Sequence, residues 1–154
     1  MSRLTIRDAT PADLPAVGRL YEASGIDTAG TNTPETLAAA WQRLHELAPQ
    51  ARVLIAEEDG QAVGTLTFFV LPMLAHGGTA AALVEAVAVD EQAQGRGVGR
   101  ALMDEAMARA RDSGCYKLAL SSNTKRESAH AFYTRLGYQR HGVSFVAAVQ
   151  EKAR

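Results

Sequence analysis

The stretch Gln94-Gly95-Arg96-Gly97-Val98-Gly99-Arg100 decides the fold, because its three glycines lie between an apolar, strand-like segment and an amphipathic helix. Glycine lets successive backbone N–H groups turn toward one point without a Cβ atom in the way. A helix that begins directly afterwards adds its own unpaired N–H groups and the positive end of its dipole. This combination predicts a pocket for a diphosphate or a similar anion.

The spacing of the glycines distinguishes this loop from other phosphate-binding loops. A dinucleotide fingerprint needs G-x-G-x-x-G, but the sixth position counted from Gly95 or from Gly97 is not a glycine. A P-loop needs G-K-[ST] at its end, and no such tripeptide follows. The pattern that fits is Q/R-x-x-G-x-G/A, with Gln94, Gly97 and Gly99 at its fixed positions. A plain glycine-rich turn is the alternative.

Size and composition are those of one globular domain, which we expect to span residues 1–154. The chain is 47% hydrophobic and 21% charged. Its 16 basic and 17 acidic residues leave no basic excess of the kind that nucleic-acid binding needs. No apolar run approaches the roughly 20 residues of a membrane span, and the N-terminus lacks a secretory apolar core. With Cys115 as its single cysteine the chain cannot form an internal disulfide, so we expect a cytoplasmic protein. From the charge balance and the lack of a long apolar run, we expect no nucleic-acid or membrane partners.

Hydrophobic periodicity and turn residues predict a mixed α/β domain around a twisted sheet, in the order β-α-α-β-β-β-α-β-α-β-β. Strands are expected near residues 4–6, 51–57, 63–71, 80–89 and 116–120, with two last strands through Tyr138 and residues 143–149. Helices are expected after Thr10, at Thr33-Pro34-Glu35, after the glycine loop, and at a capping box formed by Thr124-Lys125-Arg126-Glu127. Asp59-Gly60 predicts a hairpin, while Gly114 and Gly137 are expected to end the third and fourth helices.

This element order and three separated motifs resemble the GNAT superfamily of N-acetyltransferases. The glycine loop resembles that family's acetyl-CoA pyrophosphate loop, residues 83–90 resemble its fourth strand, and residues 129–138 resemble its C-terminal helix signature. Many members carry an asparagine where this chain has Arg126. Residues 121–126 instead resemble a subset that includes aminoalkylphosphonate N-acetyltransferases. Residues 1–50 agree only in element order.

The resemblance implies how acetyl-CoA is held. Pantetheine inserts like an extra strand where the fourth strand separates from the fifth at a bulge, and it pairs with backbone groups of Val87, Ala88 and Val89. One of those amides points at the thioester oxygen and stabilises the developing oxyanion. The other expected cofactor contacts lie in the glycine loop and the C-terminal helix region: Gln94, Gly95, Arg96, Gly97, Val98, Gly99, Arg100, Asn123, Ala129, Phe132 and Tyr133. The alternative for Arg96 and Arg100 is that each is a solvated loop cation.

Acetylation of an amine also needs a group that accepts a proton. An amine with a pKa of ~10.4 is almost fully protonated near pH 7, so a base or a water chain leading to one is required. Glu85 is the candidate base, because its carboxylate interrupts an otherwise apolar strand. A period of two places it on the face of Val87 and Val89 if no bulge intervenes. The alternative is a strand-edge glutamate that faces solvent.

Tyr133 is the candidate acid, because a phenol can hydrogen-bond or protonate a departing thiolate, whose pKa is ~8.5. It lies one helical turn beyond Ala129, on the face expected to meet the cofactor; an ordinary core tyrosine is the alternative. His76, His130 and Cys115 are weaker candidates, for acceptor contact, coenzyme contact and acyl transfer respectively. No H-x-H, H-E-x-x-H or cysteine-pair spacing indicates a metal site.

We therefore expect an acetyl-CoA-dependent N-acetyltransferase that acts by direct attack in a ternary complex on a primary amine of a small molecule or amino acid. The acceptor site is expected near residues 25–32, the first two helices and His76, with Tyr21, Asp27 and Trp41 as candidate lining residues. The alternatives are a protein or peptide N-acetyltransferase, a catalytically silent acyl-CoA-binding sensor, and a nucleotide-binding regulator. A homodimer is expected from the resemblance alone.

Overall fold

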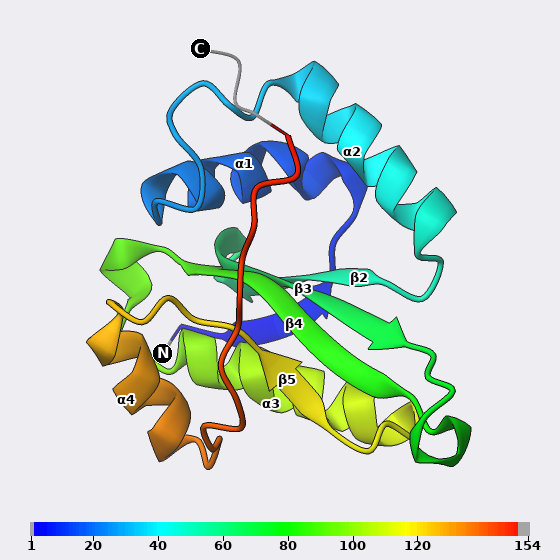
Figure 1. The fold of residues 1–154 in the computed structure, drawn as a ribbon. Coiled ribbons are helices and arrows are strands. Elements are labelled where there is room, and N and C mark those ends of the chain that lie inside the picture. Colours follow the sequence, from blue (N-terminus) through cyan, green and yellow to red (C-terminus); the bar gives the residue numbers. More distant parts are fainter. Residues whose placement is uncertain (1, 151–154) are drawn as a thin grey trace. The chain divides into compact units, whose positions relative to one another are not determined.

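The computed structural model describes residues 2–150, which fall into two compact units that divide after Leu120. The first unit is built on a five-stranded sheet with the order β1-β2-β3-β4-β5 (Figure 1). Its antiparallel strands are β1 (Leu4–Asp8), β2 (Arg52–Glu58), β3 (Gln61–Leu71) and β4 (Ala81–Val89), and β5 (Leu118–Leu120) pairs with β4 in parallel. The predicted mixed α/β class is confirmed.

Helices cover both faces of this sheet (Figure 1). The helices α1 (Leu14–Ala23) and α2 (Pro34–Leu47) lie on one face, and α3 (Val98–Asp112) lies on the other. On the first face, Val17 of α1 packs with Val53 and Ile55 of β2. On the second face, α3 buries five side chains, those of Val98, Leu102, Met103, Ala106 and Ala110. No helix of the described residues is long and apolar enough to cross a membrane.

Local sequence signals fix several of the connections in the first unit. The hairpin between β2 and β3 turns at Asp59 and Gly60, which have φ values of 49° and 81°, as a type I′ turn requires. The helix α3 ends at Gly114, with a φ of 68°. There the N–H of Cys115 donates to the carbonyl of Ala110 at 2.9 Å, which is the long bond of a Schellman motif. The predicted hairpin and the predicted end of the third helix are both confirmed.

An ion-pair cluster ties the start of α1 to the sheet. Arg7 of β1 makes two 2.8 Å hydrogen bonds to Asp13, in the short 3₁₀ turn Pro11–Asp13. It makes two more, of 2.9 Å and 2.7 Å, to Glu57 of β2. Asp13 also accepts from the backbone N–H of Thr10 at 2.7 Å. The hydrogen bonds from Arg7 hold the pKa of Asp13 at about 2, below its ordinary value of 3.8.

Asp13→Asn should lower the free energy of unfolding at pH 7 by about 1 kcal/mol, less than the full pKa difference implies because solvent screens the pair. Asparagine keeps an oxygen that can accept from Thr10, so the substitution mainly removes charge. The pKa of Asp13 is lower in the folded state than in the unfolded state. Its ionised carboxylate therefore stabilises the fold above about pH 4, and this stabilisation is lost as the pH falls toward about 2. Urea unfolding at pH 7 and near pH 2 measures this.

The matched control is Asp104→Asn, because Asp104 pairs with Arg100 at 3.7 Å on an exposed helix surface. We expect it to change stability little at either pH. An Asp13→Asn penalty of equal size at both pH values would contradict the ion-pair explanation.

Gly64 of β3 lets α3 approach the sheet closely. A Cβ atom at this position would lie 2.9 Å from Cγ1 of Val98, 3.1 Å from Cδ1 of Leu102 and 3.3 Å from the carbonyl oxygen of Ala88. Val98 is the first residue of α3, and Ala88 belongs to β4. The missing side chain of Gly64 therefore allows the N-terminal half of α3 to pack closely on β3.

Gly64→Ala should lower the free energy of unfolding by about 1–3 kcal/mol, the usual cost of overpacking. Urea unfolding followed by circular dichroism gives the measurement. Gly142→Ala is the control, since a Cβ atom there meets nothing within 4 Å, and it should leave the midpoint unchanged. Equal midpoints for the two variants would mean that α3 and β3 are not in close contact at Gly64.

The second unit contains α4 (Glu127–Arg135), which begins later than predicted. The side chain of Asn123 accepts from the N–H of Lys125 at 2.9 Å, and its carbonyl accepts from the N–H of Arg126 at 3.0 Å. These bonds form a turn in place of the predicted capping box. The predicted helix end at Gly137, which has a φ of 92°, is confirmed.

The two strands predicted through Tyr138 and residues 143–149 are not formed, since residues 138–150 contain no strand. Val143, Phe145 and Val149 are exposed. A strand is held by hydrogen bonds to a neighbouring strand, and the described residues of the second unit contain no other strand. The apolar residues of this segment predicted strands, but a sequence pattern does not show which neighbouring strand would pair with them.

Candidate active site

The strand β4 contains a bulge between Glu85 and Ala88. In the register with β3, Thr67 pairs with Glu85 and Thr65 pairs with Ala88, so one residue of β3 opposes two of β4. Inside the bulge Ala86 has a φ of 53°, in the left-handed region that residues with a Cβ atom seldom adopt. The bulge supports the expectation, drawn from the family resemblance, that the fourth strand is irregular here.

The bulge changes which side chains share a face with Glu85. A regular strand would place Val87 and Val89 on its face, but the extra residue shifts the alternation by one. Ala88 therefore shares the face of Glu85, which is the face covered by α1 and α2. Val89 pairs with Gly64 and lies on the α3 face. The grouping of Glu85 with Val89, predicted for a strand without a bulge, does not form.

Beyond the same point β4 separates from β5. Their parallel pairing joins residues 82–84 to residues 118–120 and ends there, whereas the pairing of β4 with β3 continues to Val89. Along Glu85–Val89, backbone N–H and C=O groups on the β5 side therefore have no strand partner among residues 2–150. Such an edge can pair with an extended ligand that carries amide groups, in the manner of an added strand.

The glycine loop follows β4 through a 3₁₀ turn, Glu91–Ala93, which is capped by the carboxylate of Asp90. Gly95 and Gly97 have φ values of 76° and 85°, which glycine adopts at little cost. Gly97 is the N-cap of α3. The N–H groups of the first turn of α3 therefore have no partner within the helix and are available to an anion.

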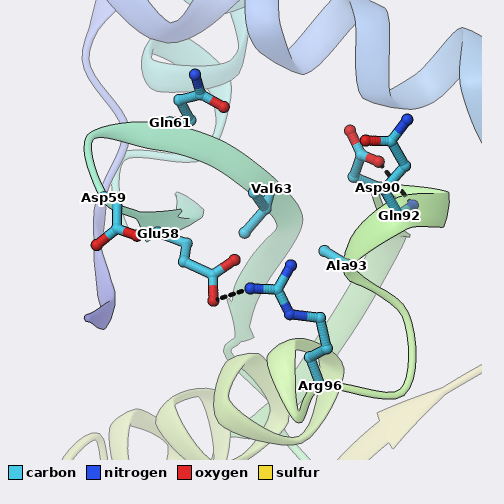
Figure 2. Close-up of a pocket in the computed structure, with 8 residues that line it drawn as sticks. All are labelled: Glu58, Asp59, Gln61, Val63, Asp90, Gln92, Ala93 and Arg96. Carbon is cyan, nitrogen blue, oxygen red and sulfur yellow. Dashed lines mark hydrogen bonds and ion pairs between the residues drawn. The ribbon is translucent and has the colours of Figure 1, made fainter. Parts of the chain in front are cut away.

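The long side chains of the loop all have partners in the first unit. Nε2 of Gln94 donates to the carbonyl of Val89 at 3.5 Å. Nη2 of Arg96 pairs with Oε1 of Glu58 at 2.6 Å (Figure 2), and Nε of Arg100 lies 3.7 Å from a carboxylate oxygen of Asp104. Arg96 thus ties the loop to the end of β2.

An open, polar hollow of about 290 Å³ lies beside the loop. Figure 2 shows the guanidinium of Arg96 directed at the carboxylate of Glu58 within this region. The lining residues come from the β2–β3 hairpin and from the segment between β4 and α3: Glu58, Asp59, Gln61, Val63, Asp90, Gln92, Ala93 and Arg96. The ion pair connects the glycine loop to the β2–β3 hairpin.

Glu85 is exposed and lies where β4 begins to separate from β5. It is therefore not a buried carboxylate inside an apolar strand, and its exposure is that of the alternative, a strand-edge glutamate. Its position at the opening nevertheless brings a carboxylate next to the backbone groups that have no strand partner.

Tyr133 lies on α4 in the second unit, with its ring centroid 5.1 Å from that of Phe132 and 6.0 Å from that of Tyr138. Burial raises the pKa of Tyr133, and the charge of Arg126 offsets part of this shift. The phenol therefore stays protonated at neutral pH, as a proton donor must. Glu85 and Tyr133 belong to different units, so their action on one substrate stays a prediction.

The other candidates in the second unit have local roles. The carbonyl of Asn123 lies 2.9 Å from Nε2 of His130, and the side chain of Asn123 caps the turn before α4. Ala129 is half-buried on the same helix. A contact from Asn123 or Ala129 to a cofactor stays a prediction.

Of the weaker candidates, His76 packs against Tyr116 in a tilted arrangement, with ring centroids 4.3 Å apart and an interplanar angle of 33°. Burial raises the pKa of Cys115, which disfavours the reactive thiolate. Among residues 2–150, no group of three or more His, Cys, Asp or Glu side chains is arranged to hold a metal ion.

Three residues that position parts of this region were not named in the sequence analysis: Gly64, Thr67 and Glu58. Gly64 interrupts an otherwise apolar strand pattern, a signal that does point to a close backbone approach. Thr67 is a polar residue in a run of apolar ones, which hints at a buried hydrogen bond. Glu58 gives no such signal, because its partner Arg96 is distant in the sequence.

The model of the Acetyltransferase (GNAT) family matches residues 17–138. The chain belongs to the GNAT acetyltransferase family. Members of this family use acetyl-CoA, and the open edge of β4 and the glycine loop described above fit such a ligand. The predicted family and the predicted acyltransferase class are thereby confirmed.

Named relatives agree with this assignment. Glucosamine 6-phosphate N-acetyltransferase of Trypanosoma brucei brucei is 33% identical over 90 residues, which are 58% of this chain and 59% of that enzyme. Aminoglycoside N(6')-acetyltransferase type 1 of Stenotrophomonas maltophilia is 36% identical over 141 residues, 88% of this chain and 86% of the relative. Aminoalkylphosphonate N-acetyltransferase of Salmonella typhimurium is 30% identical over 103 residues, 67% and 66% of the two chains.

The fold also matches solved acetyltransferase structures. A crystal structure of an acetyltransferase from Trypanosoma brucei superposes with a TM-score of 0.83 at 25% identity, over 96% of this chain and all of the other.

Gly97→Ala should weaken coenzyme A binding by about tenfold or more, because a φ of 85° costs alanine about 1–2 kcal/mol and relief of that strain turns the loop amides away. Arg96→Gln should weaken binding by less than about threefold, since its guanidinium is already paired with Glu58. Isothermal titration calorimetry compares the two variants. An Arg96→Gln loss as large as that of Gly97→Ala would mean that the arginine itself binds phosphate.

Proposed function

We propose that this chain transfers the acetyl group of acetyl-CoA to a primary amine of a small molecule or amino acid by direct attack in a ternary complex. The observation that supports this most is the adjacency of two features in one unit. The β4 edge beyond Glu85 has no strand partner among residues 2–150, and β4 leads through a short turn into the glycine loop at the start of α3. The unpaired backbone of β4 suits an amide-bearing arm, and the glycine loop suits a diphosphate.

Under this proposal the backbone N–H groups of residues 94–100 bind the diphosphate. Backbone groups of Val87, Ala88 and Val89 pair with the pantetheine amides, and one N–H of this segment stabilises the developing oxyanion. Acetyl-CoA, when bound, supplies an activated acetyl group as a thioester. The residues of the chain orient the thioester, accept a proton from the amine and donate a proton to the departing thiolate.

Glu85 is proposed to accept the amine proton directly or through water. Deprotonation of an amine with a pKa of ~10.4 costs roughly 4–5 kcal/mol at pH 7, so a carboxylate near the amine is needed most for such acceptors. The exposure of Glu85 favours a route through water. Tyr133 is proposed to give a proton to the departing thiolate.

The acceptor class is proposed from the relatives, which are named for amino sugars, aminoglycosides and aminoalkylphosphonates. Each of these compounds is a small molecule with an amine to acetylate. The expected cytoplasmic location and homodimer stay predictions.

The test is release of coenzyme A from acetyl-CoA across a panel of these amines, followed by thiol detection. Wild-type protein should release thiol with at least one amine, and the acetylated product should appear by mass spectrometry. Binding of coenzyme A without turnover on the panel or on peptide amines would instead indicate a silent sensor. Turnover on peptides alone would indicate a protein acetyltransferase.

Tyr133→Phe should lower kcat by about 100-fold or more, the usual contribution of a general acid, with little change in the KM for acetyl-CoA. Phenylalanine keeps the ring beside Phe132, so the fold is preserved. The control is Tyr116→Phe, which keeps its ring beside His76 and should turn over like wild type. An unchanged kcat for Tyr133→Phe removes this residue from the mechanism.

A further inference from the structure

Arg96 lies in the glycine loop, but its charge is paired with a strand outside the loop. Nη2 of Arg96 lies 2.6 Å from Oε1 of Glu58, at the end of β2 (Figure 2). The Glu58 side chain is only 12% exposed, whereas that of Arg96 is 48% exposed. Glu58 is therefore the buried partner of this pair, and a buried charge that loses its partner is strongly destabilised.

A second donor fixes the position of the Glu58 carboxylate. Oγ of Ser2 donates to the same oxygen, Oε1, at 2.7 Å. The backbone of Glu58 is held as well, because this residue pairs with Leu4 of β1 in the register of the sheet. Of the two side chains that bond to the carboxylate, only Arg96 carries a charge, so Arg96 is the group that compensates the charge of Glu58.

The hollow beside the loop is acidic. Of the eight residues that line it, three carry carboxylates, namely Glu58, Asp59 and Asp90, and Arg96 is the only basic one. The side chains of Asp59 and Asp90 each accept a hydrogen bond from a backbone N–H, at 3.1 Å and 2.9 Å. Glu58 is thus the carboxylate of this hollow that holds the guanidinium.

The glycine loop offers backbone donors to an anion, but both of its cations already have carboxylate partners. The first N–H groups of α3 have no partner within the helix, while Arg100 lies 3.7 Å from Asp104. A carboxylate and a phosphate bind a guanidinium through the same charge-assisted hydrogen bonds. Glu58 and a diphosphate bound to the loop therefore compete for Arg96, whose side chain is attached to the middle of that loop.

We propose that Glu58 determines the affinity of this chain for coenzyme A by holding Arg96 away from the diphosphate. This role rests on the coenzyme binding of the proposed function. The diphosphate is held by backbone N–H groups without a guanidinium, so the affinity stays below what the residues of the loop could provide. Lower affinity speeds the departure of coenzyme A after acetyl transfer, and product release limits turnover in many enzymes.

Glu58→Gln should lower the Kd for coenzyme A about tenfold, which isothermal titration calorimetry measures. Glutamine keeps the shape of the side chain and an oxygen for Ser2, but it removes the charge that holds Arg96. The released guanidinium makes a charge-assisted hydrogen bond to the diphosphate, and such a bond contributes on this scale. Glu58→Ala leaves no acceptor for Arg96 and should tighten binding as well. The gain should shrink as salt is added.

Two control variants show whether Arg96 causes the gain. Glu58→Gln combined with Arg96→Gln should bind coenzyme A like Arg96→Gln alone. Glu57→Gln removes a carboxylate charge from the neighbouring position of β2, where Glu57 pairs with Arg7 at 2.7 Å, and it should leave the Kd for coenzyme A unchanged. Far-UV circular dichroism checks that each variant is folded.

The outcomes separate this role from the proposed function. An affinity that is unchanged or lower in the Glu58 variants overturns the role. So does a gain that persists without Arg96 or that appears equally in Glu57→Gln. A wild type that binds no coenzyme A at millimolar concentration overturns the role together with the proposed function. A wild type that binds coenzyme A but acetylates no amine overturns the proposed function alone, because the comparison of Kd values still decides the role of Glu58.

Discussion

The bulge in β4 is the constraint on which the rest of the site depends. One extra residue between Glu85 and Ala88 bends the strand and increases its twist, and the pairing with β5 ends at the same place. A regular strand could continue its pairing with β5 and use up the same backbone groups. The left-handed conformation of Ala86 costs of order 1–3 kcal/mol, and it persists because the ladder with β3 continues on both sides of it.

Packing against α3 places the glycine loop beside this opening. Gly64 carries no side chain at the point where Val98 and Leu102 meet the sheet, so the first turn of α3 lies directly over β3 and β4. Farther along α3, Arg109 pairs with Asp8 of β1 at 2.5 Å. The N–H groups at the start of α3 are therefore held in place before any anion arrives, which is the condition under which such dipoles bind charge most effectively.

The bulge also divides the residues of β4 between two faces. Glu85 and Ala88 lie on the face of α1 and α2, with Thr67 and Tyr21, whereas Val89 lies on the α3 face. Under the proposed function the amine approaches from the face of α1, and the diphosphate is held at the start of α3. A direct attack needs one face of the thioester carbonyl to be free for the amine while the coenzyme stays bound, and under the proposal that is the face toward α1.

The sequence by itself determined the glycine loop, the hairpin at Asp59-Gly60 and the helix end at Gly114, because each depends on the φ angles of one or two residues and on bonds to near neighbours. It also determined the family, since those local motifs occur in the family's order. Only the tertiary structure decided the position of the bulge, the pairing of Glu58 with Arg96, and the failure of residues 138–150 to form strands. Ala86 looks like any other residue of an apolar strand, and an insertion of one residue reverses every later side chain. These three features depend on which segments, distant in the sequence, pair with one another. The free energy of that pairing is a sum over many contacts, and no local stretch of sequence contains all the residues that make them.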